Sequence, residues 1–302
     1  MEVIDNEEGF NDFGDLLLQI YKDANKDLRK HVEISQGEIS SKPPLTAEDT
    51  IGASMIERFC PRLEAIRVRD DITLENVISP KLSRTFSVGH NYEQYIRDTV
   101  LARLGIMIGK WRCNCCGHIP ETVKGDARYP MPEVCEKCES KILLDAHALE
   151  SPKYKGMRHK KPLLFTYIEE YTKNNLTMLG GYVDGFAFYS NQYYVTEFKT
   201  ANAYNFRKVR KNGPDVAHMA QIQTYMFQQN YQKGIIWYFN KDTSDELVYY
   251  IDYNKDIAHY YNNKALAFQM YLKQGTMPAP ICPNKECPRA KKCPVVEQCF
   301  NI

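Results

Sequence analysis

Residues 178–200 read MLGGYVDGFAFYSNQYYVTEFKT, and this stretch decides the fold that we expect. It contains two β-rich segments separated by Asn191 and Gln192, a pair that favours a turn, so the segments should form neighbouring antiparallel strands. The flanking sequence predicts further strands over 163–172, 234–239 and 246–253, and helices over 87–104, 214–231 and 257–272. This order predicts an α/β fold with a mixed central sheet flanked by helices.

The composition is that of a folded globular protein. The chain has 302 residues, of which 43% are hydrophobic and 25% charged. These values exclude disordered, collagen-like and small disulfide-scaffold proteins. Apolar runs are strand-sized, so we expect no membrane partner or span. The acidic start MEVIDNEEGF does not resemble a secretory signal, so we expect a cytoplasmic location, in a bacterial or phage-infected cell.

The first 47 residues are expected to form a separate acidic arm. Residues 1–50 hold 12 acidic and 5 basic residues, whereas the rest of the chain is basic. An amphipathic helix is predicted near 13–31, and a second helix from Thr46 to Val68, with Asp49 in a capping-box-like start. The main domain should comprise residues 48–302. Its basic runs lie at 153–161, 207–211 and 285–292, and they suit a polyanion partner or are solvated surface.

Four cysteines predict a zinc ribbon inserted at residues 110–145. Cys113 and Cys116 form one CxxC pair, and Cys135 and Cys138 form another, with 18 residues between the pairs. Two such pairs can place four thiolates around Zn²⁺. Cys115 is expected to be a spectator, although coordination by Cys113 and Cys115 is conceivable. The alternative is a set of free surface cysteines.

Asp184, Glu197 and Lys199 form a candidate catalytic group. Side chains alternate between the two faces of a strand, so Glu197 and Lys199 should share one face and Phe198 should be directed into the core. The preceding antiparallel strand should bring Asp184 beside Glu197. Two carboxylates without histidine form a hard oxygen site suited to Mg²⁺ or Mn²⁺, and a lysine can orient or deprotonate water there. The alternative is an exposed Asp with a surface Glu–Lys pair.

Three motifs in order give this chain a family resemblance. Gly181–Asp184 fits GxxD, Glu197–Lys199 fits ExK, and Gln221–Tyr225 fits QxxxY. The chain thus resembles the RecB-like branch of the PD-(D/E)xK nuclease superfamily. The resemblance implies a restriction-endonuclease-like core, in which Gln221 and Tyr225 line the DNA channel and help fix the catalytic lysine.

The resemblance also implies further metal ligands on the helix over 87–104. Glu93 follows Gly89 by four residues and is the expected ligand, with His90 as the competing one. The Phe198 carbonyl would complete the Mg²⁺ or Mn²⁺ site with Asp184 and Glu197.

The function that this implies is a metal-dependent DNA exonuclease. It would hydrolyse phosphodiester bonds of single-stranded or end-containing DNA in recombination, repair or phage DNA metabolism. A flap or branch endonuclease and a non-cleaving zinc and iron–sulfur DNA-binding module are the alternatives. Because the sequence has no GxxxxGK[ST] motif, helicase action would need a partner, such as a helicase or recombination protein.

The remaining cysteines resemble those of iron–sulfur RecB-like nucleases, including CRISPR-associated and helicase-linked exonucleases. There, one early cysteine and three late ones hold a 4Fe–4S cluster. The resemblance implies the following ligands: Cys60, Cys282, Cys287 and Cys293. Cys299 is the expected spare, because it alone of these five cysteines is not followed by proline. The spacing from Cys282 to Cys287 departs from the family pattern, and a second zinc or bare thiols remain alternatives.

Overall fold

The computed structural model describes residues 39–77, 80–120, 128–139, 165–174 and 176–301. They belong to two compact units, residues 1–43 with 73–88 and residues 44–72 with 89–302. In the first unit, β1 (Ile39–Lys42) pairs antiparallel with β3 (Leu74–Val77). The predicted helix near 13–31 lies outside the described residues. Apart from the first residues of helix α3 (Pro80–Gln94), the features below belong to the second unit.

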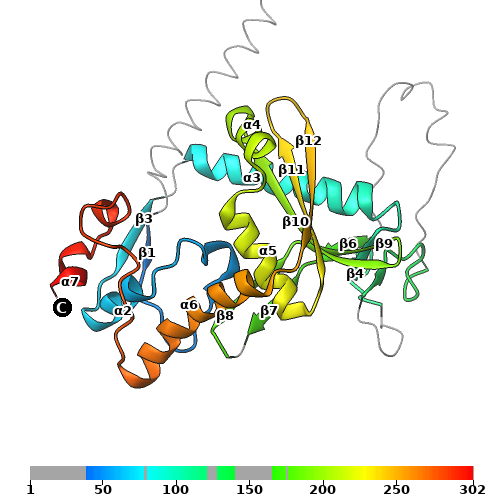
Figure 1. The fold of residues 1–302 in the computed structure, drawn as a ribbon. Helices are drawn as coiled ribbons and strands as arrows, with labels where there is room; N and C mark the ends of the chain where they lie inside the picture. Colours follow the sequence, from blue (N-terminus) through cyan, green and yellow to red (C-terminus); the bar gives the residue numbers. More distant parts are fainter. Residues whose placement is uncertain (1–38, 78–79, 121–127, 140–164, 175, 302) are drawn as a thin grey trace, which may run out of the picture. The chain divides into compact units, whose positions relative to one another are not determined.

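The main sheet of the second unit is mixed, as the sequence predicts. Its order is β12-β11-β10-β9-β4-β5, and β6 pairs with β4 outside this path. The strands are β4 (Met107–Cys113), β5 (Tyr129–Pro130), β6 (Phe165–Ile168), β9 (Gly185–Tyr189), β10 (Gln192–Ala201), β11 (Lys233–Asn240) and β12 (Glu246–Asp252). β10 and β11 run parallel, and the other pairs are antiparallel. Figure 1 shows β10, β11 and β12 side by side.

The chain changes sheets at Asp184. The sequence predicts one continuous strand through this position, but β8 (Leu179–Val183) belongs to a smaller sheet with β2 (Ile51–Gly52) and β7 (Glu170–Asn174). β9 begins directly after Asp184 and pairs with β10 in the main sheet. A continuous strand is therefore wrong, and Asp184 lies at the point where the two sheets meet in the sequence.

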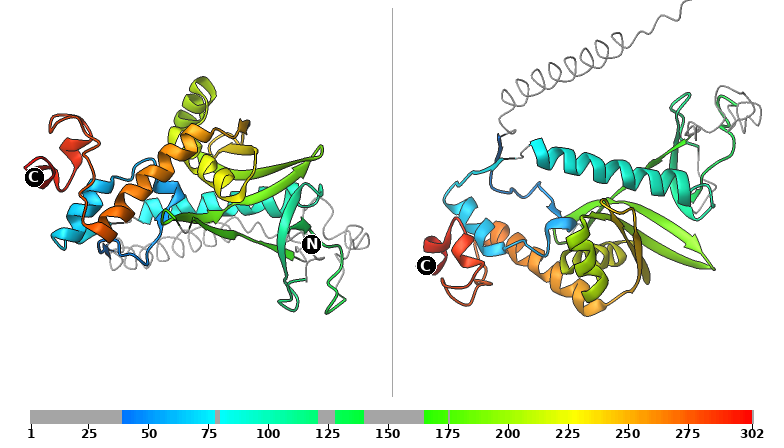
Figure 2. Two further views of the ribbon diagram at one scale, coloured as in Figure 1. Left: turned by 60° about the horizontal axis from the view of Figure 1, so that its bottom comes forward. Right: turned by 90° about the horizontal axis from the view of Figure 1, so that it is seen from above.

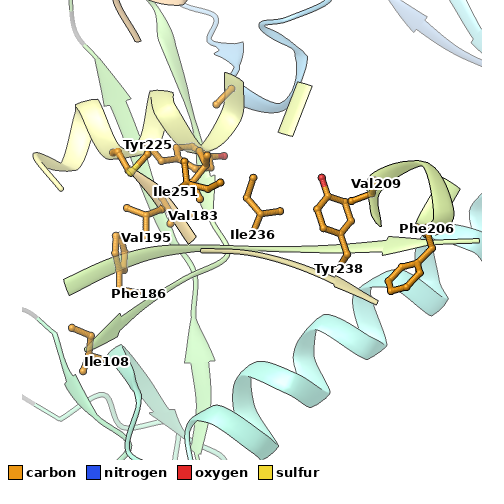
Figure 3. Packing of buried hydrophobic residues seen from close by; sticks show 14 residues of the cluster. Ile108, Val183, Phe186, Val195, Phe206, Val209, Tyr225, Ile236, Tyr238 and Ile251 are labelled. Carbon is orange, nitrogen blue, oxygen red and sulfur yellow. The ribbon is translucent and has the colours of Figure 1, made fainter. Parts of the chain in front are cut away.

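Two of the six helices in the described residues pack on the strands. The six are α2 (Pro61–Arg69), α3 (Pro80–Gln94), which continues as a π-helix (Tyr95–Leu101), α4 (Ala203–Asn212), α5 (Val216–Gln229), α6 (Lys255–Gln274) and α7 (Val296–Phe300). α3 begins in the first unit, and α4 and α5 contact β10 and β11. Figure 3 shows Val183, Tyr225 and Ile236 in the core, and all three are almost completely buried.

The predicted helix from Thr46 to Val68 is wrong in its first half. Asp49 accepts hydrogen bonds from the backbone and hydroxyl of Thr46, but these bonds close a turn that leads into β2. α2 begins only at Pro61, with Cys60 as its N-cap. Proline is favoured at this first helical position and breaks a helix that would continue through it, which accounts for the late start.

Helix α4 was not predicted, because only two of its residues are buried. Phe206 and Val209 face the core, and Asn202 caps the N-terminus by accepting a hydrogen bond from the backbone N–H of Asn205 at 2.8 Å. The rest of α4 is largely exposed and basic, so its hydrophobic signal is short. α4 follows directly on β10, the strand that carries Glu197 and Lys199.

The C-terminal segment lies beside α2, as both views of Figure 2 show. α2 also packs against α6. Among the helices that the structure describes, none is long and apolar enough to cross a membrane.

Candidate active site and cysteine clusters

Asp184, Glu197 and Lys199 meet where β8, β9 and β10 come together. Gly185 and Thr196 form the last pair of the antiparallel register between β9 and β10, and Asp184 directly precedes Gly185. The Asp184 carboxylate accepts a hydrogen bond from the backbone N–H of Phe198 at 2.8 Å. Lys199 Nζ forms an ion pair with Glu197 Oε1 on the same strand face. The structure therefore brings together the three residues that the sequence singled out.

Glu197 is the most constrained group of this site. Its side chain is completely buried, and its second oxygen, Oε2, has no hydrogen-bond partner among the described residues. Burial and the nearby charge of Asp184 raise the pKa of Glu197 well above its ordinary value. A buried carboxylate oxygen without a partner is costly, and a cation beside it relieves the cost. The oxygen donors of Asp184 and Glu197 thus fit a hard divalent ion.

Lys199 remains a cation in this environment. Burial by itself lowers the pKa of Lys199, but the charges of Glu197 and Asp184 outweigh burial and raise this pKa. The side chain of Lys199 as a whole is 23% exposed. A fixed ammonium group beside two carboxylates can orient water and stabilise developing negative charge.

Glu93 belongs to the same electrostatic group. Burial and the charge of Asp184 raise the pKa of Glu93 to about 8, and Lys199 opposes this rise. His90, the competing candidate, is exposed and lines a separate cavity. The charge of Asp184 therefore acts on Glu93, and the choice of Glu93 over His90 as a metal ligand stays a prediction.

Arg97 and Glu169 are functional candidates that the sequence analysis missed. Arg97 is almost completely buried, and its Nη1 donates to Glu93 Oε1 at 3.0 Å, to Glu169 Oε1 at 2.9 Å and to the Asp184 carbonyl at 3.1 Å. Its Nε donates to Asp98 at 2.9 Å. The spacing of four residues from Glu93 to Arg97 is the one signal that pointed to this pair. Glu169 follows β6 and carried no local signal.

Gln221 and Tyr225 lie together inside the protein. Both side chains are buried on α5, and Gln221 Nε2 donates to Tyr225 Oη at 3.4 Å. Tyr225 Oη in turn donates to the Tyr182 carbonyl at 2.7 Å. A Cβ at Gly181 would lie 2.7 Å from Tyr225 Oη, so glycine is required for this approach. These contacts hold the end of β8 that leads into Asp184.

The four cysteines of the predicted ribbon form one cluster. The Sγ atoms of Cys113, Cys116, Cys135 and Cys138 all lie within 4.8 Å of one another. Each pair sits on a similar turn, in which the backbone N–H four residues after the first cysteine donates to that cysteine's carbonyl at 2.8 Å, from Gly117 and Glu139 respectively. Four gathered thiol groups fit a tetrahedral metal ion such as zinc. Cys115 is exposed and stands outside the cluster.

Four of the five remaining cysteines border a cavity of about 450 Å³ between α2 and the C-terminal segment. Its lining includes Cys60, Cys282, Cys293 and Cys299. The side chain of Cys287 hydrogen-bonds with that of Cys282. Burial raises the pKa of the Cys60 thiol. Cysteine thiolates are the donors that iron–sulfur clusters take, so the four thiols of this lining fit such a cluster in donor chemistry. Cys299, expected as the spare, lines the cavity, whereas the expected ligand Cys287 does not.

Two arginines connect α2 and the residues just before it with the C-terminal segment around this cavity. Arg62 Nη2 donates to the Cys299 carbonyl at 2.8 Å, and its Nη1 donates to the Pro278 carbonyl at 2.8 Å. In the opposite direction, Arg289 Nη2 in the C-terminal segment donates to the Arg58 carbonyl at 2.6 Å. Each of these two arginines follows a Cys-Pro pair. The cavity is therefore held by contacts that do not themselves require a metal.

Comparisons with known proteins found limited similarity. No family model and no curated protein matches the chain. An alkaline exonuclease (LHK-Exo) from Laribacter hongkongensis is 18% identical over 35% of this chain and 59% of its own, with a TM-score of 0.30. The structure of LHK-Exo in complex with dAMP is 19% identical over 35% of this chain and 58% of its own, with a TM-score of 0.29.

A further solved structure, SSO0001, is 16% identical over 92% of this chain and 93% of its own, with a TM-score of 0.37. The matches thus span less than two thirds of the exonuclease chains. Since all three TM-scores lie below 0.5, the geometry of the site carries the functional argument.

Proposed function

We propose that this protein is a metal-dependent DNA exonuclease of the RecB-like type, acting on single-stranded or end-containing DNA in recombination, repair or phage DNA metabolism. One observation carries the proposal: buried Glu197 has an unpartnered oxygen and lies between Asp184 and Lys199. Burying such an oxygen without a partner costs free energy, and a cation bound between Glu197 and Asp184 would offset that cost.

Each residue of the site has a distinct role in phosphodiester hydrolysis. Asp184, Glu197 and Glu93, with the Phe198 carbonyl, would hold Mg²⁺ or Mn²⁺. When bound, such an ion lowers the pKa of water and neutralises charge on the phosphate. Lys199 orients the attacking water and stabilises charge that develops on the phosphate oxygens. Arg97 positions Glu93 through its hydrogen bond at 3.0 Å.

The exposed face of α4 supplies a surface for the DNA backbone. Arg207, Lys208, Arg210 and Lys211 are all exposed on this helix, which follows the strand of Glu197 and Lys199. Exposed cations on one helix attract phosphate groups without reading the sequence. The exposed basic side chains of α4 therefore support a nucleic acid as the substrate over a small uncharged molecule.

The two cysteine sites have structural roles in this proposal. The cluster at Cys113, Cys116, Cys135 and Cys138 would hold one Zn²⁺ and fix the end of β4. The cavity between α2 and the C-terminal segment would hold a 4Fe–4S cluster. The proposed ligands are Cys60, Cys282 and Cys293, which line the cavity, and Cys287, whose side chain hydrogen-bonds with that of Cys282. Elemental analysis should find zinc at about one equivalent per chain and iron at about four.

The experiment that tests the function is a cleavage assay with protein purified anaerobically. Single strands, duplexes and closed circles labelled at the 5′ or 3′ end are incubated with Mg²⁺ or Mn²⁺, and with EDTA as control. We expect metal-dependent release of short products from strand ends and no cleavage of closed circles. Cleavage of circles or internal flaps would show an endonuclease instead, and no cleavage with either metal would contradict the proposal.

A further inference from the structure

A second cavity, of about 380 Å³, lies next to the carboxylate site. Its walls come from the end of α3, from β4 and β6 and from β8, through residues that include His90, Gln94, Arg97, Arg112, Thr166 and Tyr182. Arg97 belongs to both places, because it lines this cavity and also donates to Glu93 and to the Asp184 carbonyl. A group bound in the cavity therefore lies one side chain away from the proposed metal ligands.

Arg112 is the exposed arginine of the cavity lining. It is exposed, and among the described residues no carboxylate or other acceptor binds its guanidinium group. The other arginine of the lining, Arg97, is fully engaged with Glu93, Asp98 and Glu169. Glu169 also lines the cavity and pairs with Arg97 at 2.9 Å, but Arg97 shares its single positive charge with Glu93 and Asp98 as well. Among the described residues, Arg112 is therefore the lining arginine that has no carboxylate partner, and it is the group that an entering phosphate would meet.

Tyr182 gives the cavity an aromatic wall. Its side chain is 60% exposed, whereas the next residue of β8, Val183, is buried, and its ring lies 5.1 Å from that of Tyr171. The hydrogen bond from Tyr225 to the Tyr182 carbonyl fixes the backbone at this point. A rigid, exposed aromatic ring is a surface on which an unpaired base can stack.

We propose that this cavity binds one nucleotide of the strand being cut, with Arg112 on its phosphate and Tyr182 against its base. A guanidinium group binds phosphate through paired hydrogen bonds, and the volume suits a ligand of nucleotide size. A base enters such a cavity only when it has left the duplex stack, so the cavity selects single-stranded DNA. This inference rests on the proposed function and specifies its substrate.

The four-cysteine cluster keeps Arg112 in place. Arg112 is adjacent to Cys113 on β4 and is paired in the antiparallel register with Thr166 of β6. Thr166 Oγ1 donates to Asn114 Oδ1 at 2.7 Å, which joins the two strands beyond Arg112. The strand that presents Arg112 therefore ends in a proposed zinc ligand.

The test measures binding of deoxythymidine 5′-monophosphate and of a five-residue oligothymidylate in buffer without added Mg²⁺ or Mn²⁺, where no cleavage is expected and the proposed zinc is left in place. Wild type is compared with Arg112→Ala, Arg112→Lys and Arg103→Ala, the last being an exposed arginine outside the cavity. We expect Arg112→Ala to weaken binding of both probes about tenfold or more, because charge-assisted hydrogen bonds to phosphate are lost. Arg112→Lys should recover part of this loss, and Arg103→Ala should bind within about twofold of wild type.

Three results would overturn the inference: no binding of either probe by wild type, equal binding by Arg112→Ala, or equal wild-type affinity for deoxythymidine without phosphate. Cleavage kinetics separate this failure from a failure of the proposed function. If wild type cleaves DNA, Arg112→Ala should raise KM about tenfold with kcat little changed. An unchanged KM would reject the nucleotide site and leave the nuclease proposal standing. If wild type does not cleave, the binding measurements still decide the inference.

Discussion

The carboxylate site and the C-terminal cysteine cavity differ in how far apart their residues lie in the sequence. Asp184, Glu197 and Lys199 come from one β9–β10 hairpin and the residue before it. The cavity instead joins Cys60 with cysteines more than 200 residues later, through the hydrogen bonds of Arg62 and Arg289. The first site is built by local pairing, and the second depends on closing a long loop. Changes in the first should therefore affect chemistry, and changes in the second should affect stability.

The largest effect is expected for Asp184→Asn. The amide oxygen can still accept the Phe198 N–H, but the charge for a metal ion is lost, so the cleavage rate should fall by about 10³-fold or more. The free energy of unfolding should be unchanged or higher, because the like charge beside Glu197 is removed. The matched control is Asp71→Asn, an exposed aspartate away from the site. A large loss of stability in Asp184→Asn would contradict the separation of chemistry from stability.

The opposite pattern is expected for Cys60→Ser. Loss of one ligand should remove iron and visible absorption, and should lower the free energy of unfolding by about 2–5 kcal/mol, because a link between distant segments is lost. Iron analysis and denaturant unfolding measure this, with exposed Cys115→Ser as control. Cys299→Ser should keep the colour if Cys299 is the spare. A colourless wild type that holds a second zinc would contradict the iron–sulfur assignment.

His218 supplies a pH test of the carboxylate region. Burial, and then the charge of Lys199, lower the pKa of His218 to about 4. The pKa of His218 in the folded state lies below its ordinary value. Between about pH 6.5 and pH 4 the unfolded state therefore binds more protons than the folded state. Stability from neutral His218 is therefore present above pH 6.5 and lost on acidification, by about 2–3 kcal/mol.

His218→Gln should flatten this loss, measured by denaturant unfolding at pH 7 and pH 4. Exposed His259→Gln is the control and should keep the wild-type slope. An identical pH dependence in wild type and His218→Gln would show that His218 is not buried as a neutral group beside Lys199.

The smallest effect is expected for Tyr225→Phe. It removes the hydrogen bond to the Tyr182 carbonyl and should cost about 1 kcal/mol of unfolding free energy. DNA affinity should stay within about twofold of wild type, because Tyr225 is buried. Urea unfolding and DNA titration measure the two quantities. A tenfold loss of DNA affinity at unchanged stability would instead support the direct DNA contact that the family resemblance implies.

The sequence predicted the parts of the site that follow from short-range periodicity. The period of a strand placed Glu197 and Lys199 together, and the turn at Asn191 placed β9 against β10. The four-residue spacing on α5 placed Gln221 beside Tyr225. The CxxC spacing placed the four cysteines of the ribbon in one cluster.

The sequence could not show what depends on tertiary contacts. The change of sheet at Asp184 follows from the pairing of β8 with β2 and β7, which local β-propensity does not encode. Arg97 meets Glu169 across 72 residues, so no local pattern reports this pair. The start of α2 was misjudged because the Thr46–Asp49 pair closes a turn with the same hydrogen bonds that begin a helix. The catalytic assignment of these residues stays a prediction.

Lys199→Ala tests the central claim most directly. Cleavage of end-labelled single-stranded DNA is measured at saturating Mn²⁺ and DNA for wild type and for Lys199→Ala, together with DNA affinity. We predict that Lys199→Ala binds DNA nearly as well as wild type, because distributed phosphate contacts remain. Its cleavage rate should fall at least about 10³-fold. A cleavage rate of Lys199→Ala close to that of wild type would contradict the assignment of this site as the catalytic centre.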